Sequence, residues 1–357
     1  MTIDNKKIEP CSEYLFENEG NHTVYLYIKQ NQIENMNMMF LDINKLKSVI
    51  FYPYINTNII TDISYMFSNC SSLISINLIN FDAQNVRNMS GIFYNCKDLV
   101  SLNLPKFKTQ NIIDISYMFF YCRSLTSIDL TNFDTKNVIS MEKIFFNCLS
   151  LTSIDVSNFN TQNVTSMKHM FFNCERLTYI DVSKFNTNKV KDMSFMFYEC
   201  NFLTSINVSN FNTRNVKNME SMFSGCSSLK YIDISNFNTQ KVTNMEMMFY
   251  YCYQLTSLNV SNFDTQSVTN MGKMFYFCKI LTSIDVSKFN TNKVIDMSFM
   301  FYSCSSLTSI DVSNFNTINV INMNNMFSDC SSLTSIDVSN FNTINVISMN
   351  SMFSHCL

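Results

Sequence analysis

The stretch LTSIDVSNFNTQNVTSMKHMFFNC, residues 151–174, decides the fold of this chain because close copies of it recur along most of the 357 residues. Each copy ends in a cysteine. The cysteines follow one another at a constant interval of 26 residues, at Cys70, Cys96, Cys122, Cys148, Cys174, Cys200, Cys226, Cys252, Cys278, Cys304, Cys330 and Cys356. A fixed period of roughly 20 to 50 residues is the signature of a stacked solenoid or a blade array. The sequence therefore predicts a repeat protein in which each unit contacts its neighbours.

Hydrophobic residues occupy fixed positions in every copy. Counted from a cysteine, the third residue is leucine, the sixth and eighth are aliphatic, and the eleventh is phenylalanine. Residues 153–157 alternate polar and apolar side chains, which is typical of a strand with one buried face. Met167, Met170 and Phe171 have the spacing of one helical face, and the preceding Ser166 belongs to a column of Asn, Asp and Ser that is typical of helix N-caps. Each unit is thus expected to contain a short strand and a short helical turn.

The segment from Leu151 to Val156 resembles the strand of a leucine-rich repeat. The whole unit, with its Asn-Phe-Asn/Asp-Thr bend and its Met-Phe-x-x-Cys ending, closely resembles the BspA-like leucine-rich-repeat surface proteins of bacteria and protists over about residues 46–357. The resemblance implies an α/β repeat fold, a leucine-rich-repeat-like right-handed solenoid with one short parallel β-strand and one short helical turn in each 26-residue coil. It also implies adhesion at a cell surface, without catalysis.

The chain is expected to have two regions. Residues 1–45 should form an N-terminal cap, with a hairpin over residues 13–29 and a degenerate helical turn near Met36–Phe40. Residues 46–357 should form the solenoid, with one degenerate and eleven regular repeats. Only Leu357 follows the last cysteine, so the last coil is expected to be uncovered and to invite self-association. A fragment of a longer product, or a coil that tolerates fraying, are the alternatives.

Composition argues against several classes of protein. Charged residues make up 15% of the chain and the formal net charge is -3, which argues against a nucleic-acid-binding protein. No run of about 18 apolar residues predicts a membrane span. The amino terminus has no pattern of a signal peptide and no anchor is recognisable. The resemblance suggests the cell surface, and the cytoplasm is the alternative.

No pattern predicts a catalytic or cofactor site. His22, His169 and His355 are scattered, without a partner at a recognisable catalytic spacing, and no phosphate-binding loop or nucleophile elbow occurs. The repeat cysteines occur once per unit, with no Cys-x-x-Cys pair for zinc, so they are expected to pack as small hydrophobic side chains. Cys11 lies outside this series and is the one cysteine expected to be reactive.

An acidic column lies within the strand segment. The seventh residue after a cysteine is aspartate in seven repeats, at Asp129, Asp155, Asp181, Asp233, Asp285, Asp311 and Asp337, and asparagine elsewhere. Stacked like charges repel, and a hard cation would relieve the repulsion through oxygen ligands. Neighbouring hydroxyl groups and solvent would relieve it as well. We therefore assign no metal site and keep a cation ladder as an alternative hypothesis.

Variation between copies is concentrated directly after each cysteine and between the methionines. Phe202, Tyr253 and Ile280 are apolar residues at these variable positions and suggest a contact patch, although scattered surface residues under weak constraint are an alternative. The sequence thus predicts a non-enzymatic solenoid for protein–protein interaction or adhesion at a cell surface. An intracellular scaffold or a self-assembling structural protein is the second hypothesis, and the sequence does not identify the protein partner.

Overall fold

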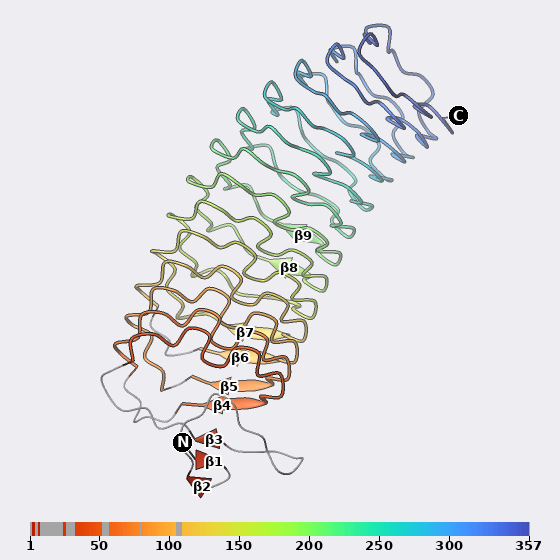
Figure 1. The fold of residues 1–357 in the computed structure, drawn as a ribbon. Coiled ribbons are helices and arrows are strands. Elements are labelled where there is room, and N and C mark those ends of the chain that lie inside the picture. The colour runs from red at the N-terminus through yellow and green to blue at the C-terminus, as the bar shows by residue number, and fades with distance from the viewer. Residues whose placement is uncertain are drawn as a thin grey trace.

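A computed structural model describes residues 2–3, 6–7, 24–25, 33–51, 57–78, 80–104 and 109–356. In it the chain winds into a long, gently curved stack of coils, with the amino-terminal coils at one end and the carboxy-terminal coils at the other (Figure 1). The phenylalanine three residues before each cysteine marks the stacking. Its ring lies 5.4–5.9 Å from the corresponding ring of the next regular coil. Residues 26 positions apart are therefore neighbours in space, and the predicted solenoid is confirmed.

The strands of the described residues are all short. β1 (Thr2–Ile3), β2 (Lys6–Lys7) and β3 (Val24–Tyr25) form an antiparallel sheet of order β2-β1-β3. In the coils, β4 (Ser48–Ile50), β5 (Ser75–Asn77), β6 (Ser101–Asn103), β7 (Ser127–Asp129), β8 (Tyr179–Ile180) and β9 (Ser205–Ile206) form the parallel pairs β4–β5, β6–β7 and β8–β9. Short parallel strands are thus confirmed for several coils. Residues 207–356 form the same extended segments without a paired strand.

The amino-terminal hairpin is only partly within the described residues. β3 lies in the expected range, but its partner is β1, with Ile3 opposite Val24. Residues 14–16, the other expected arm, lie outside the described residues. The degenerate helical turn near Met36 is a non-helical turn, whose Met36 N–H donates to the carbonyl of Asp62 in the next coil at 2.9 Å. The division of the chain near residue 45 stays a prediction.

The helical turn predicted for each coil is wrong. The described residues contain no helix, and residues 168–173 form consecutive turns. The N–H groups of Met167, His169 and Phe171 donate to carbonyls of the following coil at 3.1, 3.0 and 2.9 Å. The N–H groups of Met170 and Phe172 donate instead to the third preceding residue, both at 3.2 Å. An α-helix requires N–H groups to bond the fourth preceding carbonyl, so alternate bonding to the next coil excludes it. A single isolated turn of helix would also be too short to be stable.

Two left-handed residues in each coil produce this row of turns. They stand five residues and one residue before the cysteine, as His169 (φ 56) and Asn173 (φ 53) do. This conformation costs an L-residue about 1–2 kcal/mol and is worst for β-branched side chains. Among the described residues, none with positive φ is Val, Ile or Thr, although all three occur in every part of the repeat region. The residue types at these two positions are therefore compatible with the left-handed backbone of the turns.

The Asn, Asp and Ser column begins these turns rather than helices. Asp192 Oδ1 accepts a hydrogen bond from the N–H of Ser194 at 2.8 Å, and Asn218 Oδ1 accepts one from Glu220 at 3.0 Å. The backbones of this column form an unbroken series of parallel bridges from Asn35 to Ser348. The side chains thus bond backbone N–H groups as expected, but they close Asx turns and no helix follows.

Asparagine and threonine side chains hold the bend, which explains a chain with only 4 Gly and 3 Pro. Thr161 Oγ1 donates to the carbonyl of Asn186 in the next coil at 3.0 Å and accepts from the same residue's N–H at 2.7 Å. Asn158 and Asn163 each donate to a carbonyl of the preceding coil at 2.8 Å. Buried backbone groups are therefore satisfied between coils by side chains.

The cysteines pack as predicted. Cys96 to Cys330 are fully buried, and every cysteine of the series is a free thiol. Cys174 Sγ donates to the carbonyl of Phe145 in the preceding coil at 3.2 Å, and the other thiols repeat this bond. Burial raises the pKa of Cys200 to about 12, so the thiol stays protonated at neutral pH. Cys11 lies outside the described residues.

Candidate binding site

The three residues predicted as a contact patch lie in two different places. Phe202 is 53% exposed and makes no ring contact with the other two. Tyr253, two coils further on, is half-buried in an aromatic cluster, with its ring 5.2 Å from Tyr251 and 5.9 Å from Phe277. Ile280 is half-buried in the coil after Tyr253. A single patch of all three residues therefore stays a prediction without a shared contact.

The strand segments of the coils before and after Phe202 also carry exposed aromatic residues. Tyr179, in the preceding coil, is 54% exposed, and Tyr231, in the following coil, is 59% exposed. Tyr179 and Tyr231 stand five residues after their cysteines, whereas Phe202 stands two residues after its own. Three consecutive coils thus each expose one large aromatic side chain, in the turn after the cysteine for Phe202 and in the strand segment for Tyr179 and Tyr231. We call Tyr179, Phe202 and Tyr231 the strand-face patch.

The acidic column lies in the strand segments as well, with aspartate in seven repeats and asparagine in the others, such as Asn207 in the coil of Phe202. Asp233 Oδ1 accepts hydrogen bonds from the Ser235 hydroxyl at 2.6 Å and from the Ser235 N–H at 3.0 Å. These two bonds lower the pKa of the Asp233 carboxyl. Asp181 is bonded by the N–H of Ser183 in the same way. Among the residues that the structure describes, no three His, Cys, Asp or Glu side chains are grouped as metal ligands would be. Local serine bonds are therefore the observed partners of this column.

A second set of aromatic residues lies on the turn side of the coils. The residue two positions before the cysteine is aromatic in eight repeats, and successive rings stack with centroids 4.2–4.8 Å apart. We call this column the outer aromatic ladder, and its members are Tyr94, Phe120, Phe146, Phe172, Tyr198, Tyr250, Tyr276 and Tyr302. The hydrophobic pattern alone does not separate this column from the invariant core phenylalanine beside it. The sequence signal of the outer aromatic ladder is an aromatic residue directly after that phenylalanine.

Serine interrupts the outer aromatic ladder once and also follows its last ring. Ser224 stands between Tyr198 and Tyr250, and Ser328 stands after Tyr302. Ser224 is fully buried, and its hydroxyl has no hydrogen-bond partner among the described residues. Burial raises the pKa of Tyr276 to about 12, so the phenol within the ladder is neutral. A hydrogen bond to Asp329 raises the pKa of Tyr302, the last ring.

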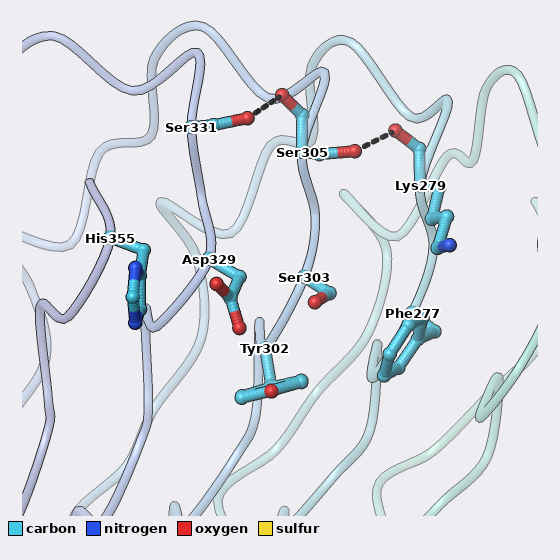
Figure 2. Close-up of a pocket in the computed structure, with 8 residues that line it drawn as sticks. All are labelled: Phe277, Lys279, Tyr302, Ser303, Ser305, Asp329, Ser331 and His355. Carbon is cyan, nitrogen blue, oxygen red and sulfur yellow. Dashed lines mark hydrogen bonds between the residues drawn. The ribbon is translucent and has the colours of Figure 1, made fainter. Parts of the chain in front are cut away.

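A groove of about 560 Å³ opens where the ladder ends at Tyr302. Figure 2 shows the ring of Tyr302 below Asp329 and Ser303, with Phe277 and Lys279 on one side and His355 on the other. Most lining residues stand one position before or one position after a cysteine. Two coils earlier, Tyr251 and Tyr253 occupy these positions, where Ser303 and Ser305 now stand. Small side chains thus hollow the surface, and we call the space the outer groove.

His169 belongs to the turn side as an aromatic ring. Its imidazole stacks on Phe195 with centroids 4.7 Å apart and planes 2° from parallel. Burial, together with the charges of Lys143 and Lys168, lowers the pKa of His169 to about 4. The imidazole is therefore neutral at pH 7 and contributes packing. His355 lines the outer groove, and His22 lies outside the described residues.

A comparison with family models identifies the family of this chain. The model described as "Mycoplasma protein of unknown function, DUF285" matches residues 14–128, 113–230, 177–283, 201–308 and 277–357. The chain belongs to the DUF285 family. The overlap of the matches reflects the 26-residue period of this DUF285 chain, which lets the model match in several registers. The finer resemblance to BspA-like proteins remains a prediction.

Solved structures similar to this DUF285 chain are leucine-rich repeat proteins. A leucine-rich repeat protein from Bacteroides ovatus is 16% identical over 86% of this chain and 83% of its own, with a TM-score of 0.32. A leucine-rich cell surface protein from Faecalibacterium prausnitzii is 17% identical over 72% and 77%, with a TM-score of 0.35. An internalin from Listeria monocytogenes is 16% identical over 81% and 80%, with a TM-score of 0.29.

A search of the curated proteins gave no match for the DUF285 chain. No helix in the described ranges is long and apolar enough to cross a membrane.

Proposed function

We propose that this DUF285 protein is a non-enzymatic solenoid that binds a protein partner and acts in adhesion at a cell surface. The observation that carries the proposal is the strand-face patch, in which three consecutive coils expose Tyr179, Phe202 and Tyr231 by 53–59%. Apolar residues that gather on a surface favour protein contact, and tyrosine and phenylalanine are enriched in interfaces. The acidic column and its serines provide a polar surround.

The architecture supports this proposal because it separates packing from recognition. The leucine, methionine, phenylalanine and cysteine columns are buried from coil to coil, and they leave little freedom for substitution. Residues directly after each cysteine differ between coils and include the exposed Phe202. A rigid stack with variable exposed columns is suited to binding a protein over several coils.

The test is capture of partners from extracts of whole cells and of host cells by the intact chain, followed by mass spectrometry. The variant pair Phe202→Ser and Tyr231→Ser introduces the serine that other coils carry in the same columns. Ile139→Thr is the matched control, because Ile139 is 49% exposed away from the patch and Thr165 occupies its column. A partner held through the patch is lost with Phe202→Ser and Tyr231→Ser and kept with Ile139→Thr. If none of the variants reduces capture of the partner, the assignment of partner binding to the strand-face patch is contradicted.

Protease treatment of intact cells, followed by antibody detection of the chain, tests the surface location. Digestion without lysis supports a surface protein. Full protection of the chain favours the alternative, an intracellular scaffold.

Self-association is a second candidate, favoured by exposed isoleucines in the last described coils. Ile318, Ile321, Ile344 and Ile347 are 41–84% exposed and form two columns on adjacent coils. Removal of such residues from water would stabilise a contact between two chains. Gel filtration over a dilution series tests this candidate. A monomer at every concentration contradicts it.

A further inference from the structure

We propose that the outer groove binds a neutral saccharide, with the ring of Tyr302 as its apolar platform. This site lies on the turn side and is separate from the strand-face patch, so it goes beyond the protein-binding function proposed above. Three properties of the groove carry the inference: the end of the ring stack, the hydrogen-bonding groups around it, and the balance of charge.

The ring of Tyr302 is the last rung of the outer aromatic ladder. Its centroid lies 4.8 Å from that of Tyr276, with the planes 12° apart, and this stacking fixes the orientation of the ring. The next coil places Ser328 in the same column, so no ring continues the stack beyond Tyr302. An aromatic face carries negative charge density, and it attracts the C–H groups of a sugar ring that carry partial positive charge. The groove thus provides a pre-oriented surface for the apolar face of a pyranose.

The polar groups of the groove match the hydroxyls of a sugar, which both donate and accept hydrogen bonds. Ser305 Oγ donates to the carbonyl of Lys279 at 3.2 Å, and Ser331 Oγ donates to the carbonyl of Ser305 at 3.4 Å (Figure 2). The protons of these hydroxyls are therefore used, and their oxygens are left as acceptors. The Asp329 carboxylate stands above the Tyr302 ring in the groove (Figure 2) and has lone pairs that accept hydrogen bonds from sugar hydroxyls. The Lys279 ammonium supplies donors on the opposite side.

Charge and size favour a neutral ligand. Lys279 and Asp329 contribute one charge of each sign, and the Lys279 ammonium lies 5.0 Å from the ring centroid of Phe277 and 5.4 Å from that of Tyr253. A nucleic acid would require several cations for its phosphates, and a carboxylate at the centre repels an anionic ligand. The volume of about 560 Å³ lies within the range of about 300–1,000 Å³ that small-molecule sites have. An uncharged ring with many hydroxyls fits these conditions.

Saturation-transfer difference NMR on the intact chain tests the proposal, with hexasaccharides of glucose, galactose, mannose and N-acetylglucosamine as probes. Two variants use residues that the chain itself carries in the same columns. Ser305→Tyr fills the groove with the residue found at Tyr253, and Tyr302→Ser removes the platform as Ser328 does. The matched control is Tyr94→Ser, because Tyr94 is the first ring of the ladder and stacks on one neighbour, Phe120, at 4.6 Å.

We expect at least one neutral hexasaccharide to bind at millimolar concentration or below, and both groove variants to weaken that binding by about tenfold or more. Tyr94→Ser should leave the affinity within about twofold. Thermal unfolding followed by circular dichroism checks that each variant is folded. The proposal is overturned if no neutral saccharide binds, if binding survives both groove variants, or if only sulfated saccharides or single-stranded polyuridylate bind. Partner capture by the strand-face patch is unaffected by these variants, so the two proposals fail separately.

Discussion

The turn side and the strand side of the coils are held together differently. On the turn side, four N–H groups of residues 193–199 donate to the next coil at distances of 2.7–3.1 Å. On the strand side, the same two coils share the two-residue pair β8–β9 and two further backbone bonds, from Thr204 to Thr178 at 3.3 Å and from Phe202 to Glu175 at 3.2 Å. The turns, rather than the strands, are therefore the main backbone connection between coils.

Ring spacing follows the same difference. Neighbouring rings of the outer aromatic ladder lie 4.2–4.8 Å apart, whereas phenylalanines of the bend, such as Phe263 and Phe289, lie 6.4–6.5 Å apart. Strands need a separation of about 4.7–4.9 Å for continuous pairing. Closer spacing of the coils on the turn side than at the bend fits the curve of the stack in Figure 1 and the lack of paired strands in residues 151–157 and 207–356.

Removal of a core ring should have the largest effect, and it should be larger on the turn side. Phe223 is fully buried between Phe197 and Phe249, each 5.7 Å away, so Phe223→Ala should lower the free energy of unfolding by about 3–5 kcal/mol. Phe237, in the bend, is 2% exposed but has no stacked ring in the described residues. Phe237→Ala should cost less by about 1 kcal/mol. Urea unfolding followed by circular dichroism measures both, and equal losses would remove the difference between the sides.

A β-branched residue should be rejected by the turns and accepted by the strands. Asn173 has a φ of 53°, so Asn173→Val should destabilise the chain by about 1–3 kcal/mol. Asn173→Gly removes the same side chain without the backbone cost and should be clearly less harmful. Ser205→Val, in β9, should change stability by less than about 0.5 kcal/mol. The same urea experiment compares the three variants, and a tolerated Asn173→Val would contradict the role given to the left-handed residues.

Amide exchange should separate the two sides within one coil. The N–H groups of Ser221 and Phe223 donate to the next coil at 2.8 and 3.0 Å, whereas those of Ile232 and Ile234 have no backbone acceptor in the described part. Hydrogen–deuterium exchange with mass spectrometry should therefore show at least about tenfold slower exchange for Ser221 and Phe223. Faster exchange on the turn side would reverse the comparison.

Acid should weaken the turn side slightly through His169. The pKa of His169 is about 4 in the folded chain and about 6.5 when unfolded, so between these values the unfolded state binds more protons. Stability should fall as the pH is lowered from 6.5 to 4. His169→Phe, which copies Phe195 of the next coil, should reduce this fall by no more than about 1 kcal/mol, because the ring is only partly buried. Thermal unfolding at a series of pH values measures the difference, with His355→Ser as the control variant.

The repeat, the buried columns and the packing of the cysteines could be predicted because they depend on periodicity alone. The helical turn could not, because Met167, Met170 and Phe171 share one face in a helix and also point inward in a row of turns. What distinguishes the two is the absence of β-branched residues at two positions per repeat, a signal that the hydrophobic pattern hides. Hydrogen bonds to a neighbouring coil then decide between the two structures.

The candidate sites were predictable only in part. Phe202 was identified from variation between copies and is exposed, but the nearby Tyr179 and Tyr231 were not singled out. Tyr253 was expected on a contact surface; it is half-buried and packs against Tyr251 and Phe277, and its part in a contact stays a prediction. The outer groove depends on small residues in three successive coils, so it cannot be seen in any one repeat. To predict a site in such a chain, each repeat position has to be compared across all coils, and the coils whose residue differs have to be noted.

Every bond between coils joins residues about one period apart, and this has a consequence for how long such a molecule can be. Gain or loss of a complete 26-residue unit would leave each remaining coil with an equivalent neighbour, because the thiol and core-ring contacts repeat from coil to coil. Length could thus be adjusted in whole units without a redesign of the interior. If such a molecule has to span a gap to its target, its length would then be set by the number of repeat units, which changes when a unit is duplicated within the gene.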